Sequence, residues 1–177
     1  CIEVACWPKG KAERKYAGVT HIDVANLDSV KADEILQYCK KKNITISALA
    51  YCPNVLDEDK ECRKKSIDHL MKVIQASALL KINLVTTFIG RNKNLNITDN
   101  LELAGNVWKP ILEYAESLNV KIAIENCPML FTEDEWPGGK NIAVSPAIWR
   151  ELFKRLPSEY LGLNFDPSHF IWQEMDY

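Results

Sequence analysis

The chain has 177 residues, of which 22 are lysine or arginine and 24 are aspartate or glutamate, so its formal net charge is −2. Hydrophobic residues make up 47% of the chain and charged residues 26%, which argues against disorder and predicts one soluble domain with a core. The balanced charge predicts no nucleic-acid partner, and no apolar run reaches the roughly 18 residues that cross a bilayer.

Six cysteines are scattered along the chain without the CxxC spacing of a metal finger or a redox motif. The chain opens on Cys1-Ile2-Glu3-Val4, with no methionine and no secretory segment. A chain of this size does not need a disulfide framework to form a core, so we expect reduced cysteines and a cytoplasmic location.

Five short β-rich segments recur along the chain, with helical patterns between them. The strands are predicted at residues 2–6, 44–50, 82–89, 120–125 and 161–166. Their first residues are 38 to 42 positions apart. A strand, a helix and their connections fill such a unit, which is typical of parallel βαβ structure.

Four helices are predicted from apolar residues at the i, i+3, i+4, i+7 spacing. Ser29 is expected to cap the first, and Ser145-Pro146 gives the last an N-cap followed by proline at the first helical position. The second and third follow apolar stripes over residues 67–78 and 101–118, and Pro110 is expected to kink the third.

Two architectures fit this order, an open doubly wound sheet and part of a (β/α)8 barrel. In residues 120–125 one face is apolar, with Val, Ile and Ile, and the opposite face carries Lys, Ala and Glu. In residues 161–166 one face is apolar, with Leu, Leu and Phe, and the opposite face carries Gly, Asn and Asp. A doubly wound sheet is covered by helices on both faces, so both should be apolar, whereas a barrel encloses a restricted interior. We therefore predict an α/β fold, a (β/α)8 TIM barrel that is incomplete in this chain.

Acidic residues end two consecutive predicted strands, at the end of a barrel where active sites lie. Glu125 ends one strand, Asp166 ends the next, and His169 follows three residues later. Clustered carboxylates are costly to bury without a cation, and carboxylates with imidazole suit Mn²⁺, Mg²⁺, Zn²⁺ or Fe²⁺. Asp166-Pro167-Ser168 also fits an ordinary turn, but its place one strand after Glu125 favours a site. Cys127 is not supported as a nucleophile, because the sequence places no base beside it.

The motifs around these residues resemble one family. Ile124-Glu125-Asn126-Cys127-Pro128 and residues 162–169, Gly-Leu-Asn-Phe-Asp-Pro-Ser-His, are similar to the sugar phosphate isomerase/epimerase family, the xylose isomerase-like TIM barrels of the AP endonuclease 2 superfamily. Residues 6–10 and 134–141 resemble a subgroup of it. The resemblance implies that residues 1–177 hold about strands two to six of eight, in a single domain truncated at both ends, and that this portion alone is inactive.

The resemblance also implies a site and a reaction. In that family one divalent metal ion (Mn²⁺, Zn²⁺, Mg²⁺ or Co²⁺) is held by residues from strands five to eight, and Glu125 and Asp166 match the first two ligands. His169 matches a histidine that binds substrate oxygen in ketose epimerases and is a metal ligand in the endonuclease branch. The implied activity is isomerisation or epimerisation of a sugar or sugar phosphate, in which Glu125 moves a proton through a metal-stabilised enediolate. Phe131 departs from the ketose 3-epimerases, which carry a substrate-contacting Glu there, so the sugar stays open.

Four more residues are candidates for substrate binding, each with a structural alternative. Glu3 faces the predicted interior, where it can contact substrate or form an ion pair with Lys121. Trp7 can line a substrate pocket, or its ring can simply pack across the end of the barrel. Asn126 can bind substrate or cap a buried loop, and Arg91 can meet a phosphate or lie solvated in a loop.

Two other functions are compatible with the sequence. One is a metal-dependent phosphoester hydrolase of the endonuclease IV-like branch, which uses many histidines and a basic surface; three histidines and a net charge of −2 argue against it. The other is a non-catalytic or inactive portion of a barrel. For the isomerase we expect a small sugar as the partner, no nucleic acid and no membrane, and a homo-oligomer stays open.

Overall fold

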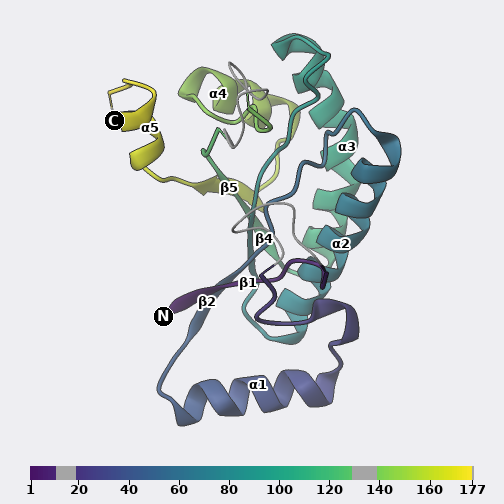
Figure 1. Ribbon diagram of the computed structural model, residues 1–177, viewed down its shortest axis with the longest axis vertical. Coiled ribbons are helices and arrows are strands. Elements are labelled where there is room, and N and C mark those ends of the chain that lie inside the picture. The colour runs from purple at the N-terminus through teal and green to yellow at the C-terminus, as the bar shows by residue number, and fades with distance from the viewer. Residues whose placement is uncertain (11–18, 129–138, 177) are drawn as a thin grey trace.

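Five parallel strands form one sheet in this computed structural model, which describes residues 1–10, 19–128 and 139–176 (Figure 1). The strands are β1 (Ile2–Ala5), β2 (Ile46–Ala50), β3 (Leu84–Thr87), β4 (Lys121–Glu125) and β5 (Leu161–Asn164). Each strand pairs with the next one along the chain, as consecutive barrel strands do, whereas a doubly wound sheet reverses its order at a switch point. The predicted barrel architecture is therefore confirmed for these five strands, where a closed barrel has eight.

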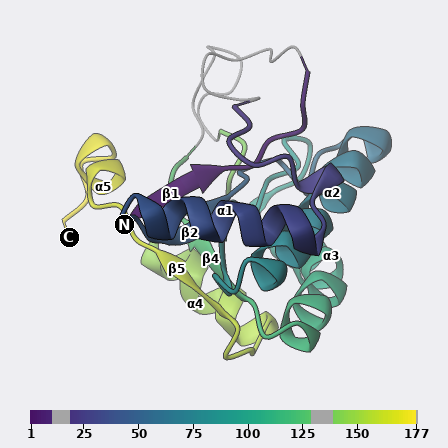
Figure 2. The ribbon, with the colours of Figure 1, turned by 90° about the horizontal axis from the view of Figure 1, so that it is seen from below.

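Helices connect the strands, and α2, α3 and α4 follow one another along one side of the sheet (Figure 2). The helices are α1 (Ser29–Lys41), α2 (Lys60–Leu79), α3 (Ile97–Ser117), α4 (Pro146–Arg155), α5 (Ser168–Trp172) and a 3-10 turn, η1 (Val24–Asn26). Within the described part of the chain, none of these helices is long and apolar enough to cross a membrane.

The starts of α1 and α4 can be compared with their predicted caps. Asp28 accepts a hydrogen bond from the backbone N–H three residues later, so Asp28 caps α1 and Ser29 is its first residue. The predicted cap is wrong by one position because the aspartate just before the serine has the same capping chemistry. Helix α4 begins as predicted, with Ser145 at the N-cap and Pro146 at the first position. Helix α3 runs through Pro110 as one helix, so the proline does not end it.

The outer face of the sheet holds the hydrophobic core. Ile122 and Ile124 of β4 are 1% and 2% exposed, and they alternate with the inward residues Ala123 and Glu125. Fully buried helix residues meet this outer face, among them Trp108, whose indole N–H donates to the Ile89 carbonyl at 3.0 Å. The alternation predicted for this strand therefore matches which of its faces is buried.

The inner face of the sheet is lined by small and polar residues. Ala48, Thr86, Ala123 and Gly162 line a cavity of about 490 Å³, together with Glu3. Leu84, Ile122, Leu161 and Leu163 also line this open hollow, so small and polar residues make up part of its wall.

His69 on α2 predicts a pH dependence of stability. Its Nε2 lies 2.7 Å from the Cys6 carbonyl, its ring packs edge-on against Tyr51, and burial lowers its pKa. The unfolded state, with a pKa of about 6.5, then binds more protons than the folded state as the pH falls below that value. We expect the free energy of unfolding to fall below pH 6.5, by at most about 1.4 kcal/mol per pH unit for this one proton.

The variant His69→Gln tests this expectation, because glutamine keeps a hydrogen-bond donor but does not titrate. Urea unfolding at pH 7.5, 6.5 and 5.5 should show a smaller loss of stability for the variant than for the wild type. Equal losses in the two proteins would assign the acid sensitivity to other groups.

Candidate active site

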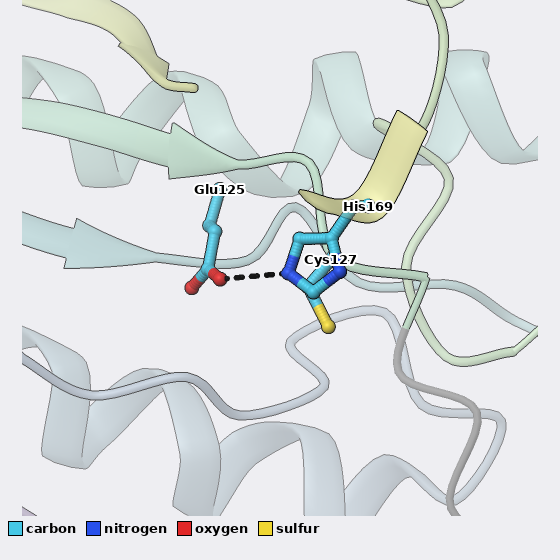
Figure 3. Close-up of side chains that lie close together, drawn as sticks. All are labelled: Glu125, Cys127 and His169. Atoms are coloured by element: carbon cyan, nitrogen blue, oxygen red, sulfur yellow. Dashed lines mark hydrogen bonds and ion pairs between the residues drawn. The ribbon is translucent and has the colours of Figure 1, made fainter. Parts of the chain in front are cut away.

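Three residues predicted as metal ligands lie together at the carboxyl ends of β4 and β5. Glu125 is the last residue of β4, and His169 lies in the first turn of α5. The His169 Nε2 lies 3.2 Å from the Glu125 Oε1 (Figure 3). The same nitrogen lies 3.6 Å from the Asp166 Oδ2. His169 therefore lies close to two carboxylates from consecutive βα units, and metal binding by these residues stays a prediction.

A buried asparagine holds the two strand ends at a fixed separation. The Asn126 side chain is fully buried; its Oδ1 accepts from the Asp166 N–H at 2.7 Å and its Nδ2 donates to the Asp166 carbonyl at 2.9 Å. Both ends of the amide are thus committed to the backbone of the next loop. These bonds match the structural alternative for Asn126, in which its side chain caps a buried loop. Substrate binding by this residue stays a prediction.

Sequence reasoning assigned no role to Asn141, which supports the end of β4. It is fully buried, and its Nδ2 donates to the Glu125 carbonyl at 3.0 Å and to the Cys127 carbonyl at 2.7 Å. One amide therefore positions the backbone on both sides of residue 126. The only feature of the sequence that pointed to Asn141 was its place in the motif of residues 134–141.

Asp166 serves a turn and faces the site at the same time. Its Oδ1 accepts from the Ser168 N–H at 2.8 Å, and contacts with Ser168 lower the pKa of the carboxyl. Its Oδ2 is the oxygen near His169. The turn interpretation and the site interpretation are therefore compatible, since each uses a different oxygen.

Negative charge gathers around Glu125. Burial raises the pKa of its carboxyl, the hydrogen bond to His169 lowers it, and the nearby charges of Glu3 and Asp166 raise it. The pKa of the Cys52 thiol is raised by burial and then by Glu125 and Glu3. A bound cation would favour the ionised form of these groups, and its own binding would be favoured in return.

Glu3 and Trp7 lie at β1 and just beyond it. Glu3 lines the inner cavity, and no ion pair joins it to Lys121 in the described structure. The Trp7 ring packs edge-on against Tyr51 with centroids 5.0 Å apart, in contact with the core. This packing fits the barrel-end plug, and contacts of either residue with substrate stay predictions.

Arg91 follows β3 in a loop that Asn54 holds. The Asn54 side chain accepts from the Arg91 N–H and donates to the Arg91 carbonyl, each at 2.8 Å. The Arg91 Nε is buried and has no hydrogen-bond partner within the described residues. This buried nitrogen is not open to solvent, so phosphate binding by Arg91 stays a prediction that rests on the rest of the guanidinium.

Gly90 is required by this loop. Its φ is +91°, and a Cβ there would lie 2.7 Å from the Asn54 Oδ1 and 2.9 Å from the Leu56 backbone nitrogen. We expect Gly90→Ala to lower the free energy of unfolding by about 2–4 kcal/mol, from backbone strain and the displaced Asn54 hydrogen bonds.

A matched control lies within α3. A Cβ on Gly105 would meet nothing within 4 Å, so Gly105→Ala should stabilise the protein by up to about 1 kcal/mol. Chemical denaturation of both variants measures the two opposite shifts. A Gly90→Ala variant as stable as the wild type would contradict the proposed loop constraint.

Several residues singled out in the sequence lie outside the described residues. They are Phe131 and residues 134–138 of the longer motif.

Five parallel strands in sequential order, with carboxylates and a histidine at their carboxyl ends, define part of a (β/α)8 barrel with its site at the usual end. Residues 1–177 match the xylose isomerase-like TIM barrel family, and the chain belongs to that family. Comparison with curated protein sequences finds no match.

Solved structures of low sequence identity share the fold. A D-tagatose 3-epimerase-like protein is 18% identical, with a TM-score of 0.69 over 94% of this chain and 56% of its own. An L-ribulose 3-epimerase is 14% identical, with a TM-score of 0.68 over 99% and 63%. The D-psicose 3-epimerase from Clostridium cellulolyticum H10, solved with D-tagatose, is 12% identical, with a TM-score of 0.68 over 87% and 54%. The chain therefore spans between half and two thirds of the length of these structures.

Proposed function

We propose that the protein is a divalent-metal-dependent isomerase or epimerase that acts on a sugar or a sugar phosphate. The observation that carries the proposal is the contact of Glu125 with His169 beside Asp166, at the carboxyl ends of neighbouring strands. Membership of the xylose isomerase-like family supports it, as do the sugar epimerases among the structures that share its fold.

The residues at this point fit a divalent metal ion. Donors around one tetrahedral ion lie about 3.3–3.8 Å apart. The Glu125 Oε1 lies 3.2 Å and the Asp166 Oδ2 3.6 Å from the same His169 nitrogen, and donor atoms of Glu125, Cys127 and His169 all lie within 4.8 Å of one another. Carboxylate and imidazole are ligands that Mn²⁺, Zn²⁺, Mg²⁺ and Co²⁺ accept to different degrees. A bound metal would supply Lewis-acid polarisation of a sugar carbonyl.

Glu125 is the residue that we assign to proton transfer. Glu125 is the last residue of β4 and its side chain is partly buried, and a carboxylate beside a sugar carbonyl can take a proton from the adjacent carbon. In the metal-free protein burial raises the pKa of this carboxyl, and a bound cation would favour its ionised form, which is the form that accepts a proton. The His169 Nε2 contacts the Glu125 carboxylate, and a contact of His169 with a substrate oxygen stays a prediction.

The sugar itself is not defined by these residues. Glu3, Trp7, Asn126 and Arg91 remain candidates for contacts with substrate, and Arg91 is the cation among them that suits a phosphate. We also propose a cytoplasmic enzyme that works on small molecules; the nearly balanced charge supports this, and the six cysteines form no disulfide.

The phosphoester hydrolase alternative gains no specific support from the histidines. His21 pairs with the backbone of Ala5, and His69 contacts the Cys6 carbonyl. Of the three histidines, His169 alone lies at the candidate site.

Deuterium exchange tests the proposal. The longest natural product of the gene, and residues 1–177 alone, are incubated in D₂O with ketoses, aldoses and their phosphates, with Mn²⁺ or Co²⁺ and after chelation. We expect metal-dependent incorporation of deuterium next to the carbonyl of at least one sugar. Metal binding without exchange on any sugar would favour a non-catalytic barrel, and release of phosphate without exchange would favour the hydrolase.

A further inference from the structure

Cys127 lies beside the pair formed by Glu125 and His169. One donor atom from each of these three residues, the carboxylate oxygen, the thiol sulfur and a ring nitrogen, lies within 4.8 Å of the other two. Figure 3 shows the three side chains turned toward one another from the end of β4, the loop after it and α5. Each is partly buried, so each is shielded without being sealed from solvent.

The position of the thiol follows from the backbone. Cys127 lies two residues after Glu125, just beyond the end of β4, and its sulfur lies within 4.8 Å of donor atoms of Glu125 and His169. Asn141 binds the carbonyls of both residues, at 3.0 Å for Glu125 and 2.7 Å for Cys127. Asn126 between them is turned the other way, onto the loop of Asp166. The buried amides therefore hold the carboxylate and the thiol on one side of the chain.

We propose that Cys127 is a metal ligand, so that Glu125, Cys127 and His169 form a mixed oxygen, sulfur and nitrogen site that selects Zn²⁺ or Co²⁺ over Mg²⁺ and Mn²⁺. On binding, the Cys127 thiol releases one proton to solvent and its sulfur forms a bond to the metal, with no change in oxidation state. Thiolate favours Zn²⁺ and related softer ions, whereas Mg²⁺ and Mn²⁺ favour oxygen ligands.

Asp166 lies beside the proposed ligands Glu125, Cys127 and His169. Its Oδ2 lies 3.6 Å from the His169 nitrogen and its Oδ1 is held by Ser168, so it can add a ligand or orient the imidazole. The surrounding negative groups, Glu3 among them, make a cation the natural counterpart of the cluster. The inference deepens the proposed function, since it concerns the same metal site.

Cobalt absorption tests the sulfur bond directly. Co²⁺ added to the metal-free wild-type protein should produce a thiolate-to-cobalt charge-transfer band in the near ultraviolet. Cys127→Ser should bind Co²⁺ without that band, and its affinity for Zn²⁺ should fall at least roughly 10-fold. Its affinity for Mn²⁺ should change less than about threefold, because an oxygen ligand suits that ion.

Cys62→Ser is the matched control, because Cys62 is exposed on α2. It should keep the cobalt band and the zinc affinity. Protection from alkylation gives a measurement on the wild type alone: Zn²⁺ should protect Cys127 from iodoacetamide, as read by mass spectrometry, while Cys62 stays reactive. This second measurement holds even when the Cys127→Ser variant fails to fold.

The outcomes separate this inference from the proposed function. Co²⁺ binding without a sulfur band, unchanged zinc affinity in Cys127→Ser, or alkylation of Cys127 in the zinc-loaded protein overturns the sulfur ligand and leaves the metal site intact. A wild-type protein that binds none of the four ions overturns the metal dependence of the proposed function and this inference together.

Discussion

Replacing Glu125 with glutamine is expected to lower the rate of metal-dependent proton exchange into the sugar by about 10²–10⁴-fold, the range for loss of a general base. Glutamine keeps the size of the side chain but loses its charge and its ability to take up a proton. The contact with the His169 Nε2 at 3.2 Å shows that the carboxylate reaches the centre of the candidate site. Exchange followed by NMR in D₂O measures the rate, and metal affinity is measured in parallel.

Glu34→Gln is the matched control, because Glu34 is exposed on α1, far along the chain from the site. It removes the same charge and should leave the exchange rate within about twofold, as expected for a surface change. A Glu125→Gln protein that binds metal and exchanges at the wild-type rate would remove Glu125 from the catalytic role.

Trp108→Ala is expected to cost about 3–5 kcal/mol of the free energy of unfolding, the range for truncating a large buried aromatic residue. The Trp108 side chain is fully buried on α3, and its indole N–H donates to the Ile89 carbonyl in the loop after β3. The substitution therefore leaves a cavity between helix and sheet and an unpaired carbonyl. Since domains are stable by about 5–15 kcal/mol, the loss should be visible as a large drop in the urea midpoint.

Two further variants separate the effect of the lost hydrogen bond from the effect of removing a tryptophan. Trp108→Phe keeps most of the ring and should cost about 1–3 kcal/mol, chiefly from the carbonyl left unpaired. Trp172→Ala removes a tryptophan that is 78% exposed and should change stability by less than about 0.5 kcal/mol. Equal effects of the substitutions at positions 108 and 172 would be incompatible with the burial described for Trp108.

Local patterns in the sequence predicted much of the fold and part of the site. Strand and helix segments repeat with nearly constant spacing, and the alternation within residues 120–125 showed which side of β4 is buried. Parallel neighbours in sequential order bring their carboxyl ends to one edge, so the sequence alone grouped Glu125, Asp166 and His169. The cap of α1 was misplaced by one residue, because adjacent Asp28 and Ser29 offer the same chemistry.

Long-range contacts were harder to predict. Cys127 was set aside because the sequence placed no histidine beside it, yet His169 lies within 4.8 Å of its sulfur. Asn126 and Asn141 could each have met substrate or backbone, and only their burial and hydrogen bonds show that they hold the strand ends. Nothing in the sequence around Gly90 predicted that a glycine is required there. The requirement comes from Asn54, on another loop.

The sequence by itself therefore determined the βα repeat, the inner and outer faces of β4, and the acidic residues at the strand ends, because each depends on residues close together in the chain. The tertiary structure decided which side chains lie close to Glu125, and which side-chain amides form hydrogen bonds with the backbone. Those contacts join residues about 40 positions apart, and they form only when hydrophobic burial of the outer face sets neighbouring strands side by side.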